Sequence, residues 1–155
     1  MSEGRAESGP IQLERLLPVP VEEVFAAWTE PAQMARWLSP TGRAEVHADV
    51  VVGGRLRVVM IDDDVRIEHD GEFLEVQPPV RLSFTWRSRY TGETPSVVTV
   101  ELHDEAGSTR LVLHHDRLPP EARASHEGGW GAILDRLSAV IDTDGSREAA
   151  QTEGA

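Results

Sequence analysis

The histidines in the last third of the chain are the side chains best suited to acid–base chemistry or metal binding. His114 and His115 are adjacent, and His126 follows shortly after them. Strand-like alternation through Ser108–Asp116 places His115 among inward apolar residues, and helical spacing places His126 on the same stripe as Trp130. Two inward imidazoles could transfer a proton or orient a ligand carbonyl, because imidazole titrates near neutral pH. A buried hydrogen bond between helix and sheet is the alternative interpretation.

Residue spacing gives little support to metal-dependent or nucleophilic chemistry. The histidines do not form an HExxH helix motif, and adjacent histidines on a strand point to opposite faces. The chain contains no cysteine, no lysine and no GxSxG turn, which removes thiolate ligands, Schiff-base chemistry and the usual serine nucleophile. We therefore assign no catalytic residue, no metal ligand and no cofactor.

A second group of residues could line a pocket for a small apolar molecule. Large aromatic side chains fall on the expected inward faces of strands and helices, and other members share the inward parity of their strands. Such a mixture of aromatic rings and imidazoles suits a pocket that orients a flat ligand, although aromatic rings also serve simply to fill a core. The candidate ligand-binding residues are Trp37, Met60, His69, Phe73, Phe84, Trp86, His115, His126 and Trp130.

Glycines surround Trp130 in the long helix that we expect near the C-terminus. Gly128, Gly129 and Gly131 each cost helix stability by about 1 kcal/mol relative to alanine. A cluster of this kind usually allows another group to approach the helix closely.

Apolar periodicity defines the elements that must position these side chains. Period-2 alternation between turn residues predicts strands, and a period near 3.6 predicts helices. Short helices are expected over Val21–Trp28 and after Pro31, and a long helix from Pro119 to about Ile141. The expected strands are Ile11–Leu17, Arg43–Val52, Arg55–Ile61, Val65–Val76, Val80–Tyr90, Ser96–Asp104 and Ser108–Asp116.

This order predicts an α+β fold in which a curved antiparallel sheet of about seven strands wraps around the C-terminal helix. The sheet has one face to bury, and only the last helix is long enough to cover it. We expect one folded domain over residues 10–142. The segments 1–9 and 143–155 hold almost no large apolar residue, so we expect both to be disordered tails.

Composition limits the classes of partner. The net charge of -12 opposes binding to nucleic acid, because the phosphate backbone is also negative. No apolar run approaches the length of a membrane span, and no secretory signal is evident. The absence of cysteine fits a reducing compartment, so we expect a cytoplasmic protein.

Sequence motifs in this order resemble a known family. They are Glu14-Arg15, VEEVFAAWTEP from Val21, RWLSP from Arg36, GEFLEVQPPVRLSFTW from Gly71, STRLVLHHDRLP from Ser108 and HEGGW from His126. Together they resemble the bacterial single-domain branch of the activator of heat-shock-protein-90 ATPase-like family, within the START/polyketide-cyclase (SRPBCC) superfamily. The resemblance covers about residues 11–142.

The resemblance implies a helix-grip fold with a hydrophobic cavity between the concave sheet and the C-terminal helix. Members of the superfamily bind lipids, steroids or other apolar molecules, so the function expected first is binding of a small apolar or amphipathic ligand. One alternative is a cyclase- or dehydratase-type enzyme that uses the cavity histidines. The other is a co-chaperone-like or regulatory module that binds a protein partner or a second copy of the chain.

Overall fold

The computed structural model describes residues 9–91 and 95–154, with side chains up to Asp142. Along the chain the elements alternate as the sequence predicts: a strand, two short helices, six strands and a long helix. Their bounds are β1 Ile11–Leu17, α2 Val21–Thr29, α3 Pro31–Trp37, β2 Ala44–Ala48, β3 Arg55–Asp62, β4 Val65–Gln77, β5 Arg81–Trp86, β6 Ser96–Glu105, β7 Ser108–Asp116 and α4 Pro120–Gly154.

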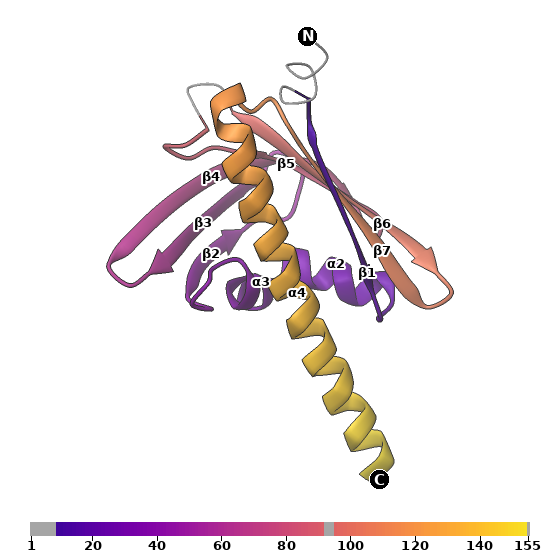
Figure 1. Cartoon of the computed structure of the whole chain (residues 1–155). Coiled ribbons are helices and arrows are strands. Elements are labelled where there is room, and N and C mark those ends of the chain that lie inside the picture. The colour runs from indigo at the N-terminus through magenta and orange to yellow at the C-terminus, as the bar shows by residue number, and fades with distance from the viewer. Residues whose placement is uncertain (1–8, 92–94, 155) are drawn as a thin grey trace.

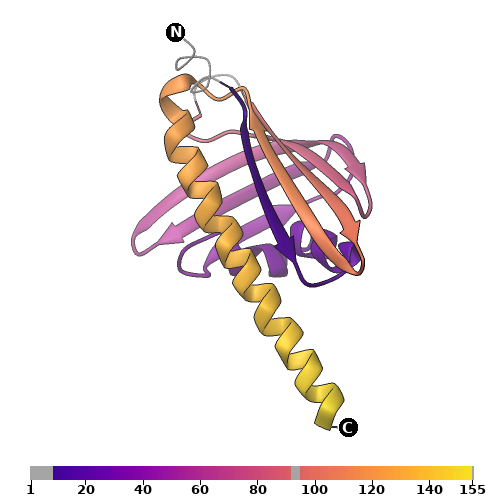
Figure 2. The same cartoon turned by 45° about the vertical axis from the view of Figure 1, so that its right-hand side comes forward.

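The strands form one seven-stranded antiparallel sheet in the order β1-β7-β6-β5-β4-β3-β2. Every strand after β2 pairs with its predecessor in the sequence, as short hairpin connections require. Strand β1 joins the far edge by pairing with β7. Figures 1 and 2 show the sheet curving around α4, which lies across its concave side. The predicted α+β helix-grip fold is therefore confirmed.

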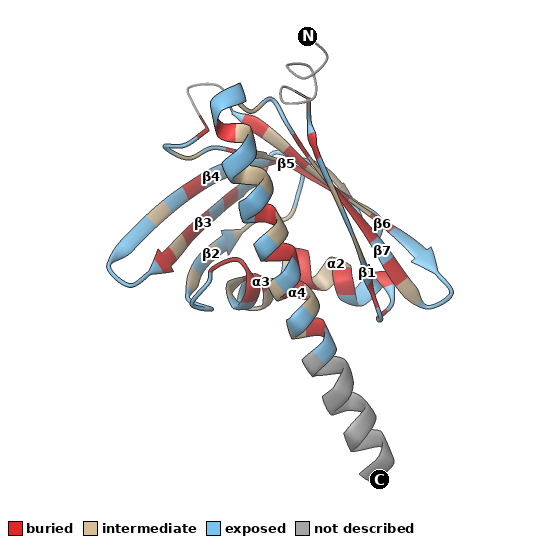
Figure 3. Ribbon diagram, viewed as in Figure 1, coloured by how far each residue is buried: buried red, intermediate tan, exposed pale blue. Residues whose placement is uncertain are grey.

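Helix α4 buries one apolar stripe against the sheet. Trp130, Leu134, Leu137 and Ile141 recur at i+3 or i+4 spacing, and all are buried. Figure 3 shows the corresponding alternation along α4 between buried positions and exposed positions. This stripe is the one that the sequence predicts, except that His126 at its start is only half-buried.

Arginine side chains attach α4 to three other parts of the chain. Arg123 Nε donates to the carbonyl of Gly9, Arg15 Nη2 donates to the carbonyl of Gly131, and Arg136 Nε donates to the carbonyl of Trp37. The last bond also satisfies a carbonyl at the C-terminal end of α3, where helical carbonyls lack intrahelical partners. These bonds fix the position of α4 over the sheet.

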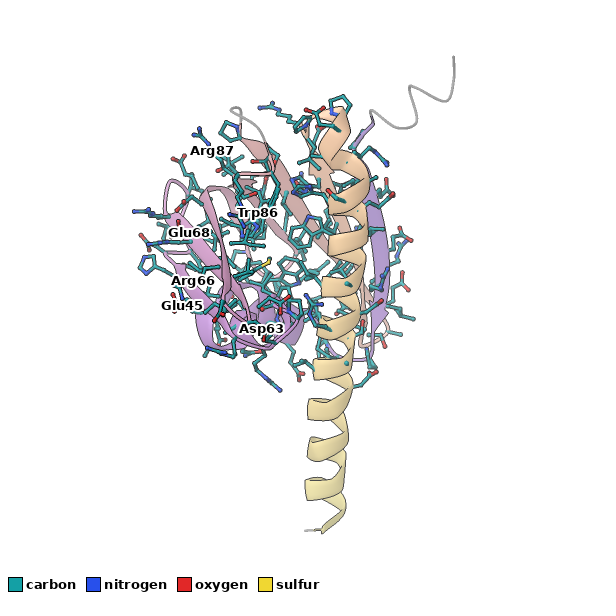
Figure 4. All side chains as sticks on the ribbon, turned by 60° about the vertical axis from the view of Figure 1, so that its left-hand side comes forward. Glu45, Asp63, Arg66, Glu68, Trp86 and Arg87 are labelled. Atoms are coloured by element: carbon teal, nitrogen blue, oxygen red, sulfur yellow. The ribbon has the colours of Figure 1, made fainter. Side chains whose placement is uncertain are left out.

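The outer face of the sheet is charged. Cross-strand ion pairs join Arg55 to Asp70, Arg57 to Glu68, Arg66 to Glu45, and Arg81 to both Glu75 and Glu101. Figure 4 shows Glu45, Arg66 and Glu68 on the side of the sheet away from α4, whereas Trp86 lies between the sheet and the helix. Exposed pairs of this kind each contribute about 0–1 kcal/mol, so they mark the solvent face more than they stabilise it.

Element ends differ from the sequence-based predictions by more than one residue at three places. Strand β2 ends at Ala48, because Asp49 to Gly54 turn back by local backbone hydrogen bonds such as Gly54 N to Val51 O. Strand β5 ends at Trp86, short of the predicted Tyr90. Helix α4 continues beyond the predicted end at Ile141 to Gly154. The assignment of residues 1–9 and 143–155 to disordered tails stays a prediction; residues 1–8 and 155 lie outside the described residues.

None of the helices in the described part of the chain combines the length and the apolar character needed to cross a lipid bilayer.

Candidate functional site

A pocket of about 370 Å³ opens between the β3–β5 part of the sheet and the first half of α4. Its volume lies in the range of about 300–1,000 Å³ that is typical of small-molecule sites. Aromatic and aliphatic side chains dominate the lining, and among the described residues no Asp, Glu, Arg or Lys contributes to it. The lining residues are Met60, Ile67, His69, Trp86, Tyr90, Ser125, His126, Gly129, Trp130 and Ile133.

A directed chain of hydrogen bonds lies behind one wall of the pocket. The indole Nε1–H of Trp130 donates to Nδ1 of His115 at 2.9 Å, so Nδ1 carries no hydrogen. The hydrogen of neutral His115 is therefore on Nε2, which donates to Oγ of Ser96 at 2.7 Å. Ser96 Oγ–H in turn donates to the carbonyl of Trp86 at 2.6 Å. Each polar atom in the chain thus has a partner, as buried polar groups require.

This chain of bonds fixes the protonation state of His115. Burial lowers its pKa to about 3, and the positive charge that His126 can carry acts in the same direction. Protonation at Nδ1 would break the bond from Trp130. The sequence left open whether His115 acts as an acid–base group or joins helix to sheet. In the structure Nδ1 joins it to Trp130 of α4 and Nε2 joins it to Ser96 of the neighbouring strand β6, so neither nitrogen is without a partner.

His69 lies on the opposite wall and is also neutral. Its ring stacks on Trp86, with centroids 4.4 Å apart and planes at 26°. Burial lowers its pKa to about 4; the nearby carbonyls of Val58 and Ile67 oppose this shift, and His126 adds to it. Its Nδ1 is buried without a hydrogen-bond partner. A buried polar atom without a partner on a pocket wall is available to a ligand.

Ser125 and His126 meet the pocket from α4. Both side chains hydrogen-bond the same backbone carbonyl, that of Ala122, from Ser125 Oγ at 3.0 Å and from His126 Nδ1 at 2.9 Å. A carbonyl only accepts, so both side chains donate to it. The ring of His126 lies 5.5 Å from that of His115, centroid to centroid. The structure thus brings together the two histidines that the sequence placed at one end of a cavity.

The candidate ligand-binding residues fall into three positions. Met60, His69, Trp86, His126 and Trp130 line the pocket, and His115 lies one layer behind Trp130. Phe73 and Phe84 are fully buried in the core and contact each other edge to face. Trp37 lies in the core against Trp28, with ring centroids 4.7 Å apart. A role in ligand binding stays a prediction for each of the nine candidates.

Sequence reasoning did not single out four of the lining residues. Ile67 shares the strand parity of His69, and Ile133 follows Trp130 by three residues on α4, so both were accessible from periodicity. Ser125 is a polar residue beside His126, which is a weak signal. Tyr90 has the parity of Trp86 in the expected strand Val80–Tyr90, but β5 ends at Trp86, so this parity does not determine where the Tyr90 side chain points.

Of the three glycines around Trp130, only Gly131 lies near another part of the described protein. A Cβ atom added to Gly128 or Gly129 would meet nothing within 4 Å, and one on Gly131 would reach only Arg15 Nη2 at 3.9 Å. No other part of the described chain therefore approaches Gly128 or Gly129 closely. The space beside Gly129 is the pocket itself.

Metal ligation is not supported by the geometry of the described residues, which contain no group of three or more His, Asp or Glu side chains that could hold an ion. His114 projects to the outer face of the sheet, where its Nε2 lies 3.4 Å from Glu101.

Comparisons with known proteins agree with this architecture. The crystal structure of protein NE0264 from Nitrosomonas europaea is 25% identical, with a TM-score of 0.75 over 90% of this chain and 97% of that one. Protein CV1439 from Chromobacterium violaceum is 27% identical, with a TM-score of 0.73 over 86% and 96% of the two chains. PFC0360w, described as an HSP90 activator from Plasmodium falciparum, is 22% identical with a TM-score of 0.72 over 86% and 96%, and this likeness shows the fold alone.

No curated protein matches the sequence. The sequence pattern of the family described as Activator of Hsp90 ATPase homolog 1-like protein matches residues 18–142. Because this match spans most of the chain, the protein belongs to the Activator of Hsp90 ATPase homolog 1-like family.

Proposed function

We propose that the chain binds a small apolar or amphipathic molecule in the pocket between β3–β5 and α4. The observation that carries the proposal is the pocket of about 370 Å³, walled by Trp86 and Trp130 and free of Asp, Glu, Arg and Lys among the described residues. Transfer of an apolar ring from water to such a surface is favourable by roughly 25 cal/mol per Å² buried.

Rigidity of the pocket wall supports the proposal. The Trp130–His115–Ser96 chain of hydrogen bonds holds one aromatic wall, and the stack of His69 on Trp86 holds the other. A site whose side chains are already ordered loses less conformational entropy when a ligand binds.

The bonded, neutral state of His115 removes one of the two histidines that an enzyme mechanism in this pocket would use. Its two nitrogens are bonded and its pKa is lowered to about 3, so it does not supply a proton acceptor near neutral pH. A reaction in this pocket would depend on His126. The protein-interaction alternative rests on the family name and on the activator from Plasmodium falciparum, whose activity is a property of that protein.

Uptake of a neutral, environment-sensitive apolar dye, such as Nile red, tests the proposal. We expect saturable binding at about one dye per chain, quenching of tryptophan fluorescence, and displacement by polycyclic competitors. Native mass spectrometry of freshly purified protein would show a co-purified molecule directly.

Matched variants place the dye in the pocket. Gly129→Leu adds a side chain where Gly129 lines the pocket, and should weaken dye binding at least about tenfold. Gly128→Leu makes the same change one residue away, where nothing lies within 4 Å and no pocket residue is replaced, and should leave binding unchanged. No saturable uptake by the wild-type protein of any probe in a broad panel would contradict the proposal and favour the interaction module.

A further inference from the structure

We propose that the pocket selects a neutral, ring-containing molecule that carries a hydroxyl or N–H hydrogen-bond donor, such as a phenol. This inference rests on the proposed function and specifies the chemical class of the ligand. It follows from the polar atoms that Ser125 and His126 present to the pocket from α4, and from the hydrogens that these two residues and their neighbours have already donated.

The Ser125–His126 pair presents lone pairs to a ligand, and its hydrogens are used elsewhere. Ser125 has one hydroxyl hydrogen and neutral His126 has one ring hydrogen, and both are donated to the carbonyl of Ala122. What remains is the lone pairs of Ser125 Oγ and the lone pair of His126 Nε2. Ser125 and His126, which are adjacent on the pocket-lining part of α4, therefore both present hydrogen-bond acceptors to a ligand.

Within the described residues, no protein donor hydrogen-bonds His126 Nε2. His115, whose ring lies 5.5 Å away, donates its single hydrogen from Nε2 to Ser96 Oγ and cannot supply one. The indole hydrogen of Trp130 is likewise donated to His115 Nδ1. Neither His115 nor Trp130, which follows His126 by four residues on α4, therefore has a hydrogen to spare, and a hydroxyl or N–H group of a ligand can supply the donor that His126 Nε2 lacks.

Charge selects against ions. The described lining contains no Asp, Glu, Arg or Lys, and His69 on the opposite wall is neutral because burial disfavours its charged form. A carboxylate ligand would find no fixed cation, and an ammonium ligand would find no anion. An unpaired charge in such surroundings is costly, whereas a neutral hydroxyl gives up little hydration and gains an imidazole acceptor.

Calorimetric titration with three naphthalene probes at pH 8 tests the inference. 2-Naphthol offers the donor and stays undissociated, since phenolic hydroxyls titrate near 10. 2-Methoxynaphthalene keeps the ring and the oxygen but lacks the hydrogen, and 2-naphthoate adds a negative charge. We expect 2-naphthol to bind about tenfold more tightly than the ether, and the ether to bind more tightly than the carboxylate.

Variants assign the preference to the acceptors. His126→Phe keeps a ring and removes Nε2, and Ser125→Ala removes Oγ; at least one should abolish the preference for 2-naphthol while affinity for the ether stays within about twofold. His47→Phe makes the same exchange at an exposed position on the outer face and should change neither affinity. Circular dichroism of each variant establishes that it is folded.

The outcomes separate this inference from the proposed function. Equal binding of 2-naphthol and the ether, tighter binding of 2-naphthoate, or a preference that survives both variants would overturn the donor inference while the pocket remains a binding site. If dyes bind but none of the naphthalene probes does, the donor inference is also wrong. If no probe and no dye binds, the proposed function itself fails.

Discussion

Mild acid should destabilise the fold through its two buried neutral histidines. Burial lowers the pKa of His115 to about 3 and that of His69 to about 4, whereas an unfolded chain holds histidine near 6.5. Between these values the unfolded state binds protons that the folded state does not. Stability therefore rises with pH through this window and is lost as the pH falls below about 6.5.

The size of the loss follows from these values. At pH 5 each histidine is almost fully protonated in the unfolded chain and almost fully neutral in the folded protein. Each histidine then lowers the free energy of unfolding by about 2 kcal/mol relative to pH 7, and the two together lower it by about 4 kcal/mol. This is a large share of the roughly 5–15 kcal/mol that stabilises a typical domain.

Urea unfolding followed by tryptophan fluorescence at pH 7, 6 and 5 measures this loss. His69→Phe keeps a ring against Trp86 and removes one titrating group, so its loss between pH 7 and 5 should be about 2 kcal/mol smaller than that of the wild type. The same variant should be at least as stable at pH 7, because it removes a buried Nδ1 that has no partner. His47→Phe, an exposed control, should retain the full dependence.

A wild-type loss below about 1 kcal/mol would refute the reasoning. So would an equal loss in the wild type and His69→Phe, since the pH dependence would then come from other groups.

Denaturant melts and scanning calorimetry check five further expectations. Trp130→Ala should destabilise the protein by about 3–5 kcal/mol, because a buried indole is lost. Trp130→Phe should destabilise it by about 1–3 kcal/mol, because His115 Nδ1 loses its donor. A loss below about 1 kcal/mol for the alanine variant would mean that α4 is misplaced. Gly71→Ala should cost about 3 kcal/mol or more, since its Cβ would lie 1.9 Å from the Thr85 carbonyl oxygen, and an unchanged melt would contradict that contact. Gly128→Ala should instead stabilise by about 1 kcal/mol, because the added methyl group meets nothing, and destabilisation would show a neighbour there. Excess chelator should leave Tm unchanged, and a drop that zinc restores would reveal a metal site.

Periodicity predicted the elements of this fold because each has one buried face. Alternation through β3 and β7 and the stripe through Trp130, Leu134 and Leu137 both report the direction in which a side chain points. The direction of each side chain, toward the core or toward solvent, could therefore be predicted from the sequence. The ends of elements depend on local turns, so the end of β2 at Ala48 could not be predicted in this way.

Depth within the core could not be predicted in the same way. Phe73 and Phe84 point inward as expected, yet they are covered by other side chains, whereas Trp86 on the same strand as Phe84 reaches the pocket. The fixed state of His115 depends on Ser96 and Trp86 facing each other across β5 and β6, in the register Trp86↔Ser96. That register is set by long-range pairing, which one strand's pattern does not encode.

The dual role of Trp130 links the position of α4 to the size of the pocket. Its ring forms part of the pocket wall, and its Nε1–H is the donor that satisfies Nδ1 of buried His115. Moving α4 away from the sheet to admit a larger ligand would leave that nitrogen unpaired, at a cost of about 1–3 kcal/mol. The contacts of Arg15 and Arg136 with Gly131 and the end of α3 oppose the same movement. A ligand too large for the pocket must therefore either offset these lost contacts or leave part of its apolar surface in water, at about 25 cal/mol per Å².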